Sequence, residues 1–277
     1  MKIALIIDSA SGIKNTQDYK DLYLVPLMIT KENGEQVADD ENLSFDDFYE
    51  LFDSELLKTS QSIPGEMMKK WDELLESYDQ VICLLISKGL SGQFNTCYMM
   101  AQDEPYKGKV FVVDTNGVAI LLKKQVSETL EYIKQGKTGE EITRLIEESN
   151  QDFTCFIIPK SLKQLVRGGR ISKSAASLAK ILKITPILKY DGTIDKEGKT
   201  RTFKKAIEQS LELLEKKCKD GDKILDIAYS RSEDETITLV KKSIKEKGFK
   251  INVTQEMPNT ITCHTGRETF ALAVWKK

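Results

Sequence analysis

Histidine is almost absent from this sequence: there is one, His264, in 277 residues. The five cysteines are scattered, and no two of them form a C-x-x-C pair. Structural zinc sites are built from clustered cysteine and histidine ligands, so the sequence argues against a metal site. An odd number of cysteines within apolar segments is typical of reduced, buried thiols, and we expect a cytoplasmic protein. His264 is then the only side chain whose ordinary pKa lies near neutrality.

An excess of charge of one sign is also absent, because 41 basic residues nearly balance 43 acidic ones. This balance excludes a strong electrostatic footprint for nucleic acid or for an anionic membrane surface. The clearest apolar run, Val81 to Ile86, is far too short to cross a bilayer. The N-terminal apolar run ends at Asp8 without a small-residue cleavage site, which predicts a first strand and not a signal peptide. No G-x-x-x-x-G-K-[ST] motif for nucleotide phosphates occurs either.

The first half of the chain alternates short apolar runs with amphipathic segments. Near-continuous apolar runs at 3–7, 81–86 and 110–113 predict strands that are buried on both faces, with helices between them. This pattern predicts a parallel-sheet, Rossmann-like α/β domain over residues 1–152. Residues 22–29 are expected to add an edge strand interrupted by Pro26.

The second half has a different pattern, in which strands and helices do not alternate regularly. An Asp191-Gly192 turn predicts a hairpin, and residues 223–255 predict a strand, a helix and a further strand. Residues 172–184 predict one small-residue helix, which is either an ordinary core helix or the lining of an apolar tunnel. We therefore expect a second, α+β domain over residues 153–277.

Three loops rich in hydroxyl groups follow predicted strands or precede predicted helices: Asp8-Ser9, Thr59-Ser60-Gln61 and Ser91-Gly92. A parallel sheet would bring such loops to one edge, where ligands bind in open α/β sheets. Neutral donors gathered there suit one carboxylate or phosphate group. His264 is the candidate imidazole donor.

Ser91 and His264 also raise the alternative of a serine hydrolase, with Asp8 or Asp114 as the third member of a triad. However, Gly89-Leu90-Ser91-Gly92-Gln93 is not a G-x-S-x-G sequence, because its second glycine comes one residue early. The motif therefore favours binding over hydrolysis.

Several short motifs occur in an order that covers essentially the whole chain. They are Thr59-Ser60-Gln61 with Pro64-Gly65-Glu66, Leu90-Ser91-Gly92, Val113-Asp114-Thr115, Arg167-Gly168-Gly169-Arg170-Ile171-Ser172, Thr185-Pro186-Ile187-Leu188 with Asp191-Gly192, Arg201 with Lys205-Ala206, and His264-Thr265-Gly266. Together they make the chain resemble the DegV family, the fatty-acid-binding FakB proteins of bacteria.

This resemblance implies a two-domain α/β protein that holds a long-chain fatty acid between and within its domains. It implies no catalytic residue, metal or cofactor. Such a protein presents the acyl carboxylate to a separate ATP-dependent fatty acid kinase, a FakA-like subunit, and carries the acyl phosphate toward phospholipid synthesis. We also expect transient contact with a membrane surface during lipid exchange.

The resemblance also implies roles for individual residues. Thr59, Ser91 and His264 would bind the carboxylate, and Arg201 would contact the kinase. Further residues expected at the lipid site are Ser60, Gly92, Leu178, Ile181 and Leu182. A protein that senses lipid without passing it on is an alternative to the carrier.

The chain departs from the family pattern at three places. Ser62-Ile63 replaces Pro-Ser in the first loop, Lys88 replaces a serine before Leu90-Ser91-Gly92, and Arg267-Glu268 replaces Pro-Gly after Gly266. We expect acyl-chain selectivity and kinase docking to be affected at these positions.

Overall fold

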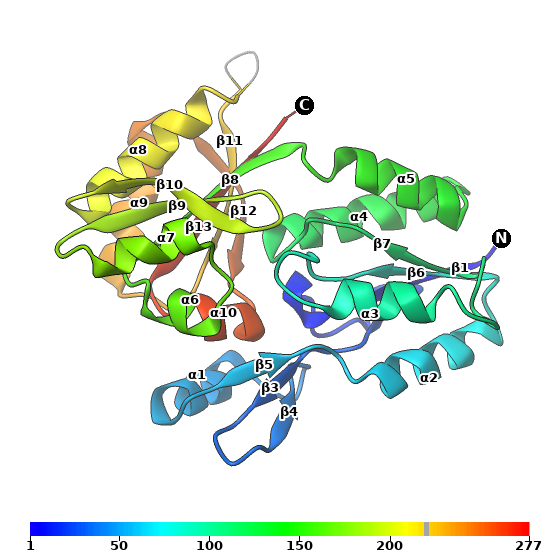
Figure 1. Cartoon of the computed structure of the whole chain (residues 1–277). Coiled ribbons are helices and arrows are strands. Elements are labelled where there is room, and N and C mark those ends of the chain that lie inside the picture. The colour runs from blue at the N-terminus through cyan, green and yellow to red at the C-terminus, as the bar shows by residue number, and fades with distance from the viewer. Residues whose placement is uncertain (219–221, 277) are drawn as a thin grey trace. The chain divides into compact units, whose positions relative to one another are not determined.

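The computed structural model describes residues 1–218 and 222–276, which form two compact units (Figure 1). Unit 1 comprises Met1–Asn150 with Pro258–Thr260, and unit 2 comprises Gln151–Met257 with Ile261–Lys277. The expected fold class is confirmed, since one unit contains a parallel sheet with helices and the other a second sheet with helices. That the units are separately folding domains divided near residue 152 stays a prediction.

Unit 1 is built on a four-stranded sheet in the order β2-β1-β6-β7, in which all neighbours are parallel. Its strands are β1 (Ile3–Ile7), β2 (Leu22–Leu24), β6 (Gln80–Leu84) and β7 (Val110–Val113). Figure 1 shows helices on both faces of this sheet. One face carries α2 (Pro64–Leu75) and α3 (Gln93–Met100), and the other carries α4 (Ile120–Lys134) and α5 (Gly139–Ser149). The strands between them are buried on both sides, as their apolar runs predict.

The single strand expected over residues 22–29 is wrong, because the chain divides there into two strands of different sheets. β2 ends before Pro26, and β3 (Met28–Thr30) is the middle strand of a small antiparallel sheet with β4 (Gln36–Ala38) and β5 (Lys58–Ser60). Proline has no N–H and fixes φ, so it interrupts a ladder at this point. Thr59 and Ser60 consequently lie on a strand, not in a loop. Helix α1 (Phe45–Ser54) connects β4 to β5, and Ser44 caps it.

Unit 2 contains a six-stranded mixed sheet in the order β10-β9-β8-β13-β11-β12. Its strands are β8 (Phe153–Pro159), β9 (Thr185–Tyr190), β10 (Ile194–Thr200), β11 (Ile224–Tyr229), β12 (Lys250–Glu256) and β13 (Thr269–Trp275). The Asp191-Gly192 turn joins β9 to β10 as a hairpin, with Tyr190 opposite Ile194. Helices α8 (Phe203–Glu215) and α9 (Asp234–Glu246) cover a core that includes Phe156, Leu211, Leu225 and Leu272. Helix α10 (Asn259–Thr265) precedes β13.

The continuous helix expected over residues 172–184 is also wrong. After α6 (Lys163–Gly168), the chain instead forms α7 (Lys173–Ala176) and a short 3₁₀ helix, η2 (Ser177–Lys180). Lys183 has a left-handed φ of 54°, so an α-helix cannot continue through it.

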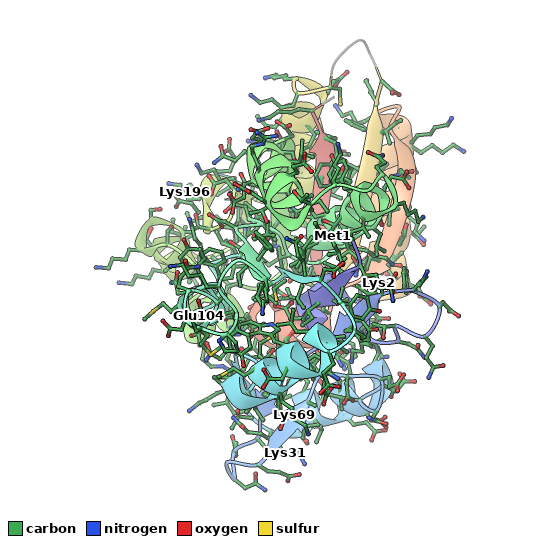
Figure 2. All side chains as sticks on the ribbon, turned by 90° about the vertical axis from the view of Figure 1, so that its right-hand side faces the viewer. Met1, Lys2, Lys31, Lys69, Glu104 and Lys196 are labelled. Atoms are coloured by element: carbon green, nitrogen blue, oxygen red, sulfur yellow. The ribbon has the colours of Figure 1, made fainter. Side chains whose placement is uncertain are left out.

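Exposed lysines occur in both units. Figure 2 draws the side chains on the ribbon, and among those it labels, Lys69 and Lys196 are exposed. Within residues 1–218 and 222–276, no helix is both long and apolar enough to cross a membrane.

Candidate functional site

The loops that follow β1 and β6 meet at one edge of the parallel sheet in unit 1. β1 pairs with β6 in parallel, and their C-terminal residues Ile7 and Leu84 are register partners. Asp8 follows β1 directly, and the turn that contains Ser91 follows β6. Parallel pairing therefore places the two loops together, at the edge where open α/β sheets bind ligands.

Asp8 organises this edge through hydrogen bonds to its buried carboxylate. Its Oδ2 accepts from the Ile86 N–H at 2.8 Å and from the Gln93 side-chain Nε2 at 3.0 Å. Its Oδ1 accepts from the Ala10 N–H at 3.0 Å. Burial raises the pKa of Asp8 to about 7, against the opposing effect of these donors. The Asp8 carboxylate thus serves to hold backbone and amide groups in place.

Gln93 connects Asp8 to the segment that carries Thr59. Its side-chain Oε1 accepts from the Ser62 N–H at 2.6 Å, and the Ser62 hydroxyl donates to the Val25 carbonyl at 2.8 Å. A second connection joins the same elements, because the Thr96 hydroxyl on α3 donates to Gln61 Oε1 at 3.0 Å. The structure therefore brings the Asp8, Thr59–Gln61 and Ser91 segments together, as the sequence predicts.

The unit 1 residues expected at the carboxylate site are partly exposed. Thr59 is paired with Ile29 across β5 and β3, and both Thr59 and Ser60 are partly exposed. The Ser91 hydroxyl, also partly exposed, accepts from the Gln93 N–H at 3.3 Å. A Cβ added to Gly92 would meet only Gln61 Oε1, at 3.9 Å, so the space beside this glycine is open.

Asp114, one candidate for a catalytic triad, has a different role in unit 1. Its Oδ2 pairs with Lys88 Nζ at 2.5 Å, and this hydrogen bond raises the pKa of Lys88. Lys88, which departs from the family pattern, is thus an ion-pair partner on the loop before Ser91. The other triad candidate, Asp8, is fully buried and bonded as described above.

His264 lies on α10, in the part of that helix that belongs to unit 2. Burial, together with the smaller effect of the positive charges of Arg170 and Arg167, lowers the pKa of its imidazole to about 4. The imidazole is therefore neutral at physiological pH, and it lies in a region of positive potential. A neutral imidazole has one N–H donor and one acceptor nitrogen, so it can donate to a carboxylate without carrying charge.

The Arg167-Gly168-Gly169-Arg170 motif forms the wall against which this imidazole packs. A Cβ added to Gly168 would lie 2.2 Å from His264 Nδ1, so only glycine leaves room for the ring. Gly169 ends α6 with a left-handed φ of 67°, and Arg170 Nη1 donates to the Gly168 carbonyl at 2.7 Å. The sequence prediction omitted Arg170 and Gly168 as neighbours of His264. The paired glycines flanked by arginines were the signal that could have indicated them.

Unit 2 also contains an apolar groove, with a cavity volume of about 580 Å³. Its lining residues come from the start of α6, from η2 and from the start of β9: Leu162, Val166, Leu178, Ala179, Ile181, Ile184 and Pro186, together with the basic Lys160, Lys163 and Arg167 and with Ser161. Leu178 and Ile181, both expected at the lipid site, line this groove. Leu182 does not line it and is 88% exposed, because η2 ends at Lys180 and the chain turns at Lys183.

Two further predicted positions lie elsewhere in unit 2. Arg201 is exposed, immediately before the Thr202 cap of α8. Glu268, in the Arg267-Glu268 departure, pairs with Lys160 Nζ at 2.5 Å and accepts from the Thr236 hydroxyl at 3.0 Å. Glu268 thus connects the residue that follows β8 to α9. In the part of the chain that the structure describes, no three histidine, cysteine or acidic residues are grouped as metal ligands.

Comparisons of the sequence and of the structure with known proteins all lead to the same family. The model of a family described as "Uncharacterised protein, DegV family" matches residues 2–277. A DegV domain-containing protein of Streptococcus pyogenes is 32% identical, over 99% of this chain and 99% of its own. The solved structure of a fatty acid binding DegV family protein from Streptococcus agalactiae is 26% identical, with a TM-score of 0.86 over 100% of this chain and 99% of that one. DegV from Bacillus subtilis, solved as a fatty acid binding protein, is 26% identical with a TM-score of 0.83, over 99% of this chain and 98% of that one.

Proposed function

The chain belongs to the DegV family, and from that premise we propose that it binds a long-chain fatty acid. The observation that carries the proposal is the convergence of the Asp8, Thr59–Gln61 and Ser91 segments at one edge of the parallel sheet. Partly exposed hydroxyls gathered there suit the head group of a fatty acid, because a carboxylate leaving water needs several donors. The likeness to solved fatty-acid-binding structures supports the same function.

In this proposal the carboxylate accepts hydrogen bonds from Thr59, Ser91 and His264, and Ser60 and Gly92 border the same site. The hydroxyls donate without adding charge, and the low pKa of His264 keeps the imidazole neutral. A hydrogen bond to a charged group contributes about 1.5–3 kcal/mol. Three such donors would select an acid over an ester or an alcohol of the same chain length.

The acyl chain occupies the apolar groove of unit 2, against Leu178 and Ile181. Each methylene that leaves water contributes about 0.8 kcal/mol, so the chain supplies most of the affinity and the head group supplies the selectivity. The groove volume of about 580 Å³ falls in the range of small-molecule sites.

The protein does not itself catalyse a reaction in this proposal, and it needs no cofactor. A separate, FakA-like kinase phosphorylates the presented carboxylate in the cytoplasm, and the carrier delivers the acyl phosphate toward phospholipid synthesis. Arg201 contacts that kinase: it is exposed at the start of α8, where a cation is free to meet a partner. The sequence itself carries no nucleotide-binding motif, which agrees with a separate kinase.

Exchange of lipid with a membrane surface would use the exposed end of η2. Leu182 is 88% exposed, and Lys180 and Lys183 on either side of it are exposed as well. An apolar side chain between two lysines suits an interface with anionic lipid, where each lysine near the surface contributes about 1 kcal/mol.

Lipid extraction tests the proposal most directly. The purified protein is denatured, extracted with solvent and analysed by mass spectrometry, and it is separately titrated with oleate and palmitate. A near-stoichiometric long-chain fatty acid, or uptake of an added one, is expected; neither bound lipid nor uptake would overturn the proposal. Turnover of an activated ester that is lost in Ser91→Ala would replace it with a hydrolase. Bound lipid without phosphorylation by a cognate kinase would indicate a sensor.

A further inference from the structure

Gln93 is a polar side chain in an unusual place, because it is the first residue of α3 and yet it is only 1% exposed. Both ends of its amide are used: Nε2 donates to Asp8 at 3.0 Å and Oε1 accepts from the Ser62 N–H at 2.6 Å. A backbone N–H can only donate, so the amide must present Oε1 to Ser62, and its Nε2 is left to donate to Asp8. The two partners therefore fix the orientation of the amide, and the amide in turn fixes the distance between them.

The two partners belong to the two segments that carry the hydroxyl donors of the proposed head-group site. Ser91 lies two residues before Gln93, and its hydroxyl oxygen accepts a hydrogen bond from the Gln93 N–H at 3.3 Å. Thr59 lies three residues before Ser62, whose hydroxyl is in turn bonded to the Val25 carbonyl. The bond from Thr96 to Gln61 joins the same segments at a second point. The spacing of the two donor segments thus depends on side chains of α3.

The hydrogen bond from the Ser62 N–H depends on which residue stands at position 62. This chain has serine there, where the loop pattern of the family that it resembles has proline, and proline has no N–H to donate. The backbone bond from Ser62 to Gln93 exists here because that position carries a residue with an N–H.

We propose that Gln93, held by Asp8, is a positioning residue that sets the spacing between the Thr59 and Ser91 segments and thereby the recognition of a carboxylate. The inference rests on the proposed function, since it explains how the head-group site of that function is held. Hydrogen bonds weaken steeply with angle and distance, so two donors on separate segments recognise one carboxylate only when their spacing is fixed. Gln93 itself need not touch the ligand.

The test compares Gln93→Met with Gln125→Met as a matched control. Gln125 is also a buried glutamine of unit 1, and its Nε2 donates to the Thr115 carbonyl at 2.7 Å, at the end of a different strand. Dissociation constants are measured for a fatty acid and for the alcohol of the same chain length. We expect Gln93→Met to weaken acid binding about tenfold, which corresponds to about 1.4 kcal/mol, while alcohol binding changes less than about twofold. Gln125→Met should leave the ratio of the two constants unchanged.

A ratio of the two constants in Gln93→Met equal to that of the wild type would overturn the inference. This holds whether both affinities are unchanged or both fall equally, as they do after general damage to the fold. If Gln93→Met does not fold, Thr96→Val removes the second connection at a partly exposed position and should lower the same ratio by a smaller factor; an unchanged ratio there overturns the inference. A wild-type protein that binds neither acid nor alcohol refutes the proposed function instead.

Discussion

The Asp8–Gln93 region of unit 1 and the His264 region of unit 2 hold polar groups in place by opposite means. Around Asp8, a buried carboxylate and an amide fix three segments through directional hydrogen bonds. Around His264, the imidazole is positioned by shape, against a glycine that leaves no room for a Cβ. The first region therefore depends on the direction of its hydrogen bonds, and the second is sensitive to the size of the residue at position 168.

The two regions also respond to protons in opposite directions. The pKa of Asp8 in the folded protein is raised to about 7 from its ordinary 3.8, so its contribution to stability is fully present below pH 3.8 and is lost as pH rises through 7. The pKa of His264 is lowered to about 4 from 6.5, so its contribution is fully present above pH 6.5 and is lost as pH falls through 4. Between pH 4 and 6.5 the two effects oppose each other.

The largest expected effect comes from removing one of these groups at a time. In Asp8→Asn, the free energy of unfolding should rise from pH 4 to 6.5 more steeply than in the wild type. In His264→Gln it should fall relative to the wild type over the same range. Each difference should be on the order of 3–4 kcal/mol in urea denaturation, because the pKa of Asp8 is raised from 3.8 to about 7 and that of His264 is lowered from 6.5 to about 4. Parallel pH profiles for the wild type and both variants would contradict the opposed titration.

The next largest effect is a loss of stability when the space beside His264 is filled. Gly168→Ala would place a Cβ 2.2 Å from His264 Nδ1, and overpacking of this kind costs about 1–3 kcal/mol. The variant should be destabilised by that amount in denaturant titration, and fatty acid binding should weaken as the ring moves. The only imidazole in the chain gives an isolated NMR signal, which should shift in the variant.

Gly65→Ala is the matched control for that substitution. Gly65 lies in α2, with nothing within 4 Å of an added Cβ, and alanine is favoured over glycine within a helix by about 1 kcal/mol. This control should be as stable as the wild type or more stable, with an unchanged imidazole signal. Equal destabilisation of both variants would show that His264 does not depend on the shape of Gly168.

A smaller effect is expected from the hydroxyls of unit 1. Ser91→Ala removes one donor to the proposed carboxylate, which should weaken fatty acid binding about tenfold, as for loss of one hydrogen bond to a charged group. Stability should change little, because the Ser91 side chain is partly exposed and accepts one bond at 3.3 Å. Ser54→Ala, at an exposed end of α1, is the control and should leave binding unchanged. Affinity equal to that of the wild type in Ser91→Ala would remove this residue from the site.

The smallest effect on stability is expected at Gly92, in direct contrast to Gly168. Gly92 has an ordinary right-handed φ of −72°, and an added Cβ meets only Gln61 Oε1 at 3.9 Å. Gly92→Ala should therefore unfold within about 0.5 kcal/mol of the wild type, as for surface substitutions generally. If the head group borders this glycine, fatty acid binding weakens all the same, and calorimetric titration separates the two results. Unchanged affinity would place the head group elsewhere.

Much of unit 1 could be predicted because its signals are local. The apolar runs that became β1, β6 and β7 are buried on both faces, which leaves little choice of structure, and parallel pairing then determines where their loops meet. The errors lie where the outcome depends on long-range packing. The strands on either side of Pro26 join different sheets, and the helix expected over 172–184 breaks before Leu182. Both regions contain residues that favour the expected element, so composition alone did not indicate the break.

The sequence alone determined the fold class, the family and the inventory of polar side chains, because apolar periodicity and ordered motifs are properties of the chain itself. It contained His264, Thr59 and Ser91 as candidate donors, and it lacked the G-x-x-x-x-G-K-[ST] motif. Only the tertiary structure decided that Gln93 is buried between Asp8 and Ser62, and that Gly168 lies against the imidazole. These contacts join residues 31 to 96 positions apart, and burial, which displaces the pKa values of Asp8 and His264, exists only once distant segments pack together.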